Sequence, residues 1–147
     1  MKKLSVLLGA LLYSASPAVA EDFVYLKCQT TIHSIVWNWT ETKELNKWIS
    51  HADVLYKIDT KNEELFVSSK SEIAIQYELQ HPGFIGWTEQ VSGERISGEN
   101  HMYLQYDPPG AVDGGMNHSD NERRLKYFGR IAGDCEASDA SDYEASK

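Results

Sequence analysis

The sequence is poor in cysteine and in basic residues, and it has no long hydrophobic run. Its 147 residues include two cysteines and 14 Lys or Arg against 22 Asp or Glu. Binding to phosphates draws its affinity from clusters of Lys and Arg that displace counterions. Nucleic acid and anionic membrane surfaces are therefore not expected partners. A membrane-spanning helix needs roughly 20 apolar residues, whereas the apolar run at 4–13 is half that length.

The N-terminus has the order of features that is typical of a signal peptide. Lys2 and Lys3 precede the apolar run, and small residues end the segment at Ala18 and Ala20. We therefore expect residues 1–20 to be a cleaved signal peptide and the mature protein to be periplasmic or secreted, without a stable membrane anchor. Loss of the two lysines leaves 12 basic residues against 22 acidic ones, a formal charge of −10.

Motifs of common enzymes are missing as well. The chain has no Gly-x-Ser-x-Gly, no Cys-x-x-Cys and no His-Glu-x-x-His, and its five histidines include no close pair. The glycines of Gly93-Glu-Arg-Ile-Ser-Gly98 are spaced as in a phosphate loop, but Glu99 and Asn100 stand where Lys and Ser or Thr are required. The sequence predicts no cofactor and no metal. It favours a noncatalytic protein, although a triad assembled from distant residues stays open.

The two cysteines lie close to the two ends of the expected mature chain. An exported protein enters an oxidising compartment, in which a disulfide persists. We therefore predict a bond between Cys28 and Cys135, which would join the first strand to the last and close a loop of about 100 residues.

Alternation of apolar and polar residues dominates the chain and predicts strands with one buried face. The alternating sets include Val24 to Cys28, Val54 to Ile58, Ile73 to Leu79 and Leu125 to Ile131. One segment differs, since Leu45, Trp48, Ile49 and Ala52 follow helical spacing and Thr42 is available as an N-cap. The predicted fold is mainly β, a small antiparallel barrel or sandwich of about seven or eight strands. It has one short helix at 43–51 and is closed by the disulfide between its ends.

The expected organisation after the signal peptide is one domain followed by a tail. Residues 21–135 contain all of the predicted strands and no Pro-rich or Gly/Ser-rich linker, so they are assigned to a single β domain. Residues 136–147 are rich in Ser, Asp and Glu, so we expect a disordered acidic tail.

A polar segment at 107–122 is the predicted contact region. It shows no apolar periodicity, and long loops in small domains are often functional. Its candidate binding residues are Asp107, Asp113, Asn117, Asp120 and Glu122. Their oxygen atoms could hold calcium, but the spacing matches no recognised calcium loop. The pairing of carboxylates such as Asp107, Asp113 and Asp120 leaves a small hydrolase as an alternative.

The four tryptophans, at positions 37, 39, 48 and 87, admit two interpretations. Aromatic side chains at alternating strand positions are usually core residues. Exposed on one sheet face, the same rings could stack on sugars, which leaves a sugar-binding module as an alternative function.

Three segments resemble short exported bacterial proteins with no assigned chemistry: Tyr56-Lys-Ile-Asp59, Glu94-Arg-Ile-Ser-Gly98 and Phe128-Gly-Arg-Ile-Ala-Gly133-Asp-Cys135. The resemblance implies a compact β domain. The expected architecture is also similar in outline to periplasmic inhibitors of C-type lysozyme. The leading hypothesis is an exported, noncatalytic domain that binds an envelope protein or a small ligand. Inhibition of a cationic cell-wall hydrolase is the alternative that this similarity implies.

Overall fold

The computed structural model describes residues 22–68 and 73–147, and the predicted signal peptide lies outside them. These residues form one antiparallel sheet of nine strands and one short helix. The strands are β1 (Phe23–Asn38), β2 (Glu44–Asp59), β3 (Glu64–Val67), β4 (Ile75–Gln76), β5 (Glu78–His81), β6 (Phe84–Ser92), β7 (Ile96–Tyr106), β8 (Pro109–Asp120) and β9 (Leu125–Ala137). The helix is α1 (Ala140–Ala145).

The strand order is β4-β3-β2-β1-β9-β8-β7-β6-β5, so nearly every strand pairs with its neighbour in sequence. The sheet closes through one segment: β4 pairs with β3, β5 pairs with β6, and only Tyr77 separates β4 from β5. The predicted mainly β antiparallel fold is therefore confirmed, and of the two predicted architectures, barrel or sandwich, it is a nearly closed barrel. The described residues form nine strands, where seven or eight were expected.

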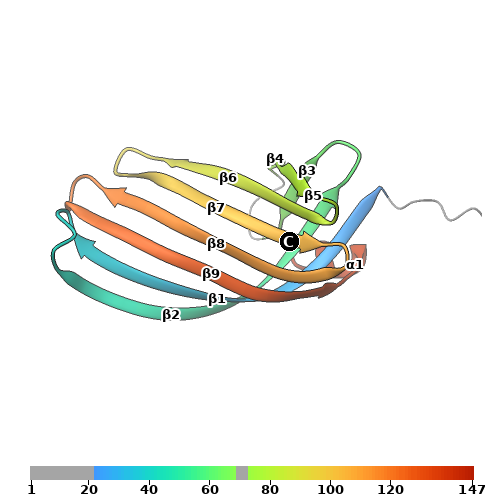
Figure 1. Cartoon of the computed structure of the whole chain (residues 1–147), viewed down its shortest axis with the longest axis horizontal. Helices are drawn as coiled ribbons and strands as arrows, with labels where there is room; N and C mark the ends of the chain where they lie inside the picture. Colours follow the sequence, from blue (N-terminus) through green and yellow to red (C-terminus); the bar gives the residue numbers. More distant parts are fainter. Residues whose placement is uncertain (1–21, 69–72) are drawn as a thin grey trace, which may run out of the picture.

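Closure is confined to one end of the molecule. Figure 1 shows β2, β1, β9, β8, β7 and β6 running side by side along the long axis, with β3, β4 and β5 gathered at the end that carries α1. We call that end the closed half. The remainder is the open half, made of the six long strands alone. It comprises residues 29–53, 88–101 and 113–133.

Side chains that point into the closed half form the hydrophobic core. Leu26, Ile58, Leu65, Ile85 and Leu104 come from five strands and are completely buried. Even-numbered positions of β1 point inward, as strand alternation requires. We use the term inner face for this side of the sheet and its continuation into the open half.

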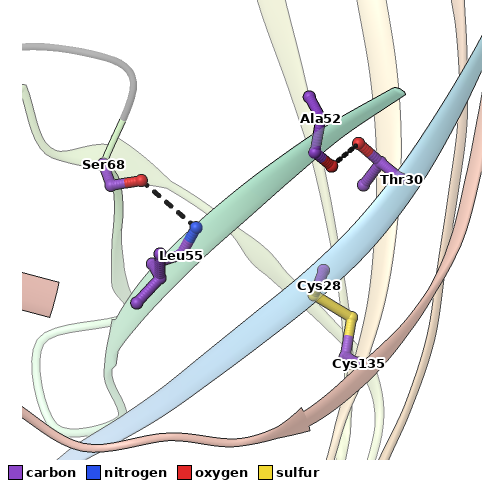
Figure 2. Close-up of a disulfide and its surroundings, with 6 residues drawn as sticks. All are labelled: Cys28, Thr30, Ala52, Leu55, Ser68 and Cys135. Carbon is purple, nitrogen blue, oxygen red and sulfur yellow. Dashed lines mark hydrogen bonds between the residues drawn. A yellow bond between two sulfur atoms is a disulfide. The ribbon is translucent and has the colours of Figure 1, made fainter. Parts of the chain in front are cut away.

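The predicted disulfide between Cys28 and Cys135 is confirmed. The two residues are directly opposite each other where β1 pairs with β9, and Figure 2 shows the bond crossing between these strands. The first and last strands are thus joined by hydrogen bonds and by a covalent bond.

The predicted helix at 43–51 is wrong, because these residues belong to β2. Leu45, Trp48 and Ile49 do recur at helical spacing, but all residues at 44–53 are exposed, so the spacing marks no buried helix face. Backbone pairing of β2 with β1 makes this segment a strand instead. Thr42 is a turn residue: its N–H donates to Asn38 Oδ1 over 2.9 Å.

The expected loop at 107–122 is also wrong in its main part, since residues 109–120 form β8. Its glycines, which resemble those of a loop, make room for side chains of the neighbouring strands. A Cβ atom on Gly114 would lie 2.3 Å from the Met102 sulfur, and one on Gly110 would lie 2.6 Å from the side-chain oxygen of Gln105. Only the short turns on each side of β8 remain irregular.

The structure places the helix α1 in the segment expected to be a disordered tail. Strand β9 extends to Ala137, and Asp139 caps α1 by accepting a hydrogen bond from the Asp142 N–H. Tyr143 is 2% exposed and its ring lies 6.0 Å from that of Tyr25. One buried aromatic side chain thus anchors a segment whose composition is otherwise that of a disordered chain.

Candidate functional site

The five candidate binding residues do not come together. Asp107 lies in the turn before β8, and Glu122 lies in the turn after it. Asp113 and Asn117 are exposed odd-numbered positions of β8, on the outer side of the sheet. Asp120 is inward-facing and completely buried. The candidates are therefore distributed over two turns and two faces of the sheet.

Two of these carboxylates have structural partners. Asp113 accepts a hydrogen bond from Arg130 on β9 over 3.1 Å, and this bond lowers the pKa of Asp113. Asp120 accepts bonds from Arg95 Nε and Nη2 over 2.8 and 2.6 Å, and a third from the Arg123 N–H over 2.8 Å. Asp120 therefore connects the β6–β7 and β8–β9 turns at the far end of the open half.

The environment of Asp120 predicts a pH-dependent contribution to stability. Hydrogen bonding from Arg95 holds the pKa of Asp120 below its usual range. The stabilisation by this ion pair is fully present above the pKa of an aspartate in the unfolded chain, roughly 4. It is lost as the pH falls through the lower pKa that Asp120 has in the folded protein. The Asp120→Asn variant should thus unfold at a lower temperature than wild type at pH 7, with a smaller difference at pH 3. Thermal unfolding followed by circular dichroism measures both.

The matched control is Asp134→Asn, which removes an exposed carboxylate from β9. This variant should unfold at the same temperature as wild type throughout the pH range. If the difference in unfolding temperature between wild type and Asp120→Asn stayed constant from pH 7 to pH 3, the ion pair would not be its source.

The inner face of the open half is the surface that the fold leaves uncovered. In the closed half, the core covers this face. In the open half, none of the elements in the described part of the chain packs across it, because β3, β4, β5 and α1 all lie at the other end (Figure 1). A sheet normally buries one face against another layer. In the open half the sheet is a single layer, and apolar side chains on its inner face are exposed to solvent.

Two pockets hollow this face. One, of about 200 Å³, is lined by Ser34, Trp48, Ile96, Met116, His118 and Tyr127, among others. The second, of about 180 Å³, lies at the mouth of the closed half and includes Ile32, Tyr56, Trp87, Glu89, Asn100 and Ile131. Trp48 and Ile96 are 43% and 38% exposed. The first pocket therefore offers accessible apolar surface.

A row of polar side chains crosses the inner face between the two pockets. His118 on β8 lies 2.8 Å from Asn100 Oδ1 on β7, and Asn100 Nδ2 donates to Glu89 on β6 over 3.4 Å. An amide oxygen can only accept, so His118 Nε2 carries the proton of the first bond. Asn100 and Glu89 line the second pocket, and His118 lines the first. The site thus combines apolar walls with a connected polar row.

The tryptophans do not form a common platform. Trp87 is a core residue, 7% exposed, whose ring meets the edge of Tyr56 at 6.0 Å between centroids. Trp37 and Trp39 are partly buried where β1 ends. Only Trp48 presents a ring to the uncovered inner face, so the single-face arrangement that sugar stacking requires is not observed.

Sequence analysis missed the two residues that β8 contributes to the first pocket, Met116 and His118. The signal that could have found them is the alternation of Val112, Met116, His118 and Asp120 with polar or small residues. Three glycines and two prolines at 108–115 obscured this period, because such residues are typical of turns.

Within residues 22–68 and 73–147, no three His, Cys, Asp or Glu side chains gather as a metal site would require. The same residues include no helix with the length and hydropathy needed to cross a membrane. Comparison with protein-family models, curated proteins and solved structures finds no match for this chain.

Proposed function

We propose that this protein is an exported, noncatalytic binding domain of the cell envelope, and that its ligand occupies the inner face of the open half. The observation that carries the proposal is the uncovered apolar pocket around Trp48, Ile96 and Met116. The predicted signal peptide supports export, and the disulfide agrees with an oxidising compartment.

The chemistry of this face favours an amphiphilic ligand. Apolar contact with the pocket walls contributes roughly 25 cal/mol for each Å² removed from water. Glu89 and Asn100 offer oxygen atoms at the neighbouring polar row. The mature chain is also strongly acidic. A ligand with an apolar chain and a neutral or cationic head that donates hydrogen bonds fits these features, whereas an anionic head meets an unfavourable field.

The proposal can be tested with N-phenyl-1-naphthylamine, a neutral apolar dye that fluoresces when it leaves water. Met116→Lys places a charge in the first pocket and should weaken dye binding about tenfold or more, because a buried charge without a partner is costly. Fluorescence titration measures the affinity. Dodecylamine should also displace the dye at lower concentration than dodecanoate, because the head groups differ in charge.

The matched control is Asn117→Lys, which adds the same charge one residue away on the outer side of β8. It should bind the dye as wild type does. Equal affinities of the two lysine variants would contradict the assignment of the ligand to the inner face.

A carboxylate-dependent hydrolase is not proposed. Its candidates were Asp107, Asp113 and Asp120, and these lie in a turn, on the outer side of β8 and in a buried ion pair. They share no cleft.

A further inference from the structure

The outer edge of β2 in the open half has no strand beside it within the described residues. Strand β3 pairs with residues Tyr56–Asp59 only, and β1 occupies the other side of β2 along its whole length. Residues 44–53 therefore form a free edge ten residues long. We call this segment the β2 edge.

The direction of the backbone groups along the β2 edge follows from two hydrogen bonds drawn in Figure 2. The Leu55 N–H donates to Ser68 Oγ over 3.1 Å, on the β3 side of β2. On the opposite side, the Thr30 hydroxyl of β1 donates to the Ala52 carbonyl over 2.7 Å. Backbone groups alternate in direction along a regular strand, and the β1/β2 register shifts only between Glu44 and Asn46. Odd-numbered residues 47–53 therefore direct their N–H and C=O groups outward. Of these, the Lys47 N–H donates to Asn46 Oδ1 over 2.9 Å.

Exposed apolar side chains accompany these outward backbone groups. Leu45, Trp48 and Ile49 are 48%, 43% and 59% exposed. The β2 edge contains no proline, and its pairing with β1 has no irregularity between Asn46 and Asp53. A long, regular and apolar edge of this kind is a template for pairing with another strand.

We propose that the β2 edge pairs antiparallel with the β2 edge of a second copy of this chain, about a twofold axis at Ser50. Inner-face residues lie opposite inner-face residues only when this axis, perpendicular to the sheet, passes midway between the two copies of one residue. With the axis at Ser50, Lys47 lies opposite Asp53 of the other copy at both ends of the paired segment, and Ile49 lies opposite His51.

The other registers are less favourable in charge. An axis at Lys47 would place the two Lys47 side chains directly opposite each other, and like charges in that position are destabilising. An axis at Ile49 would place Leu45 opposite Asp53 and Lys47 opposite His51. An axis at Trp48 would place Lys47 opposite Ile49, and Asp53 opposite Lys43, which lies before β2 with its N–H and C=O bonded to Asn38. The Ser50 register is therefore the one in which opposite charges within β2 face each other.

The pairing would extend the inner face across both copies. Two six-stranded open halves would form one continuous sheet, and Trp48 of each copy would lie opposite Ala52 of the other on its inner face. A twofold interface is closed, so it uses both β2 edges without forming a fibre. Because a pair of edges buries less than the roughly 1,600 Å² of a standard interface, we expect a dissociation constant on the order of 10 μM. The dimer does not depend on the ligand proposed above.

Cysteine substitution tests the register, since both native cysteines are bonded to each other. Directly opposed residues of a non-hydrogen-bonded antiparallel pair have Cα atoms about 4.5 Å apart, within disulfide range. Ser50→Cys should therefore form a disulfide-linked dimer in air-oxidised protein at roughly ten times the dissociation constant. The matched control is Ala52→Cys, two residues further along the same face. Its two copies would be about 14 Å apart and should not cross-link. Non-reducing electrophoresis measures both.

Charge exchange provides a second measurement that keeps Ser50. Asp53→Lys should weaken dimerisation roughly tenfold in sedimentation experiments at low salt, because it places lysine opposite Lys47 twice in each dimer. The double variant Lys47→Glu/Asp53→Lys should restore the wild-type constant. Equal cross-linking of the two cysteine variants, or a double variant as weak as Asp53→Lys, would overturn the proposed register. A wild-type chain that stays monomeric throughout the concentration series would overturn the dimer itself.

Discussion

Replacing Cys28 and Cys135 together with alanine is expected to lower the free energy of unfolding by about 3 to 5 kcal/mol. The bond joins residues 107 positions apart, so its loss releases a large loop in the unfolded chain. Cys28 is also completely buried in the core. Urea denaturation of the oxidised wild type and the double variant, followed by fluorescence, measures the difference.

Wild-type protein unfolded in the presence of a reductant provides the control for this prediction. It should resemble the double variant, because both lack the covalent bond between β1 and β9. A loss below about 1 kcal/mol in the double variant would mean that residual contacts already restrict the unfolded chain about as much as the disulfide does.

The Trp87→Ala variant is expected to lose about 3 to 5 kcal/mol of stability. Trp87 is 7% exposed, belongs to the core cluster and packs edge-on against Tyr56. Burial in this cluster also raises the pKa of Tyr56 to about 12. Removing the indole would leave a cavity between β6 and β2 that these strands cannot fill. Urea denaturation of wild type and variant measures the loss.

Trp48→Ala is the matched substitution at an exposed ring of the open half. It should cost less than about 1 kcal/mol, measured at a concentration low enough to exclude association, because most of the ring's contact is with solvent. Comparable losses for the two variants would mean that Trp48 is part of the folding core, and would contradict an uncovered inner face.

The open half could not be predicted from the sequence for a clear physical reason. Period-two alternation shows that a strand has an apolar face, but it does not show what covers that face. Val54 and Tyr56 of β2 face a core, whereas Trp48 of the same strand and face lies exposed. The difference arises because β3 pairs only with the last residues of β2.

Errors in the two misassigned segments have a related cause. Residues 44–52 have few buried contacts of their own, and their strand structure comes from pairing with β1. Residues 109–120 read as a loop because Gly114 and Gly115 lack the propensity of a strand. In the sheet, the absence of a Cβ on Gly114 is what admits Met102. Local propensity points away from the structure in both segments, and long-range pairing determines it.

The sequence by itself determined the class of the fold and the disulfide between the first and last strands. Alternating apolar residues require strands with a buried face, and two cysteines in an expected exported chain have only each other as partners. The tertiary structure alone decided where the barrel closes, which face stays open and which strand edges stay unpaired in the described residues. Those features depend on the register of strands far apart in the chain, and register is a property of pairs of segments rather than of any one of them.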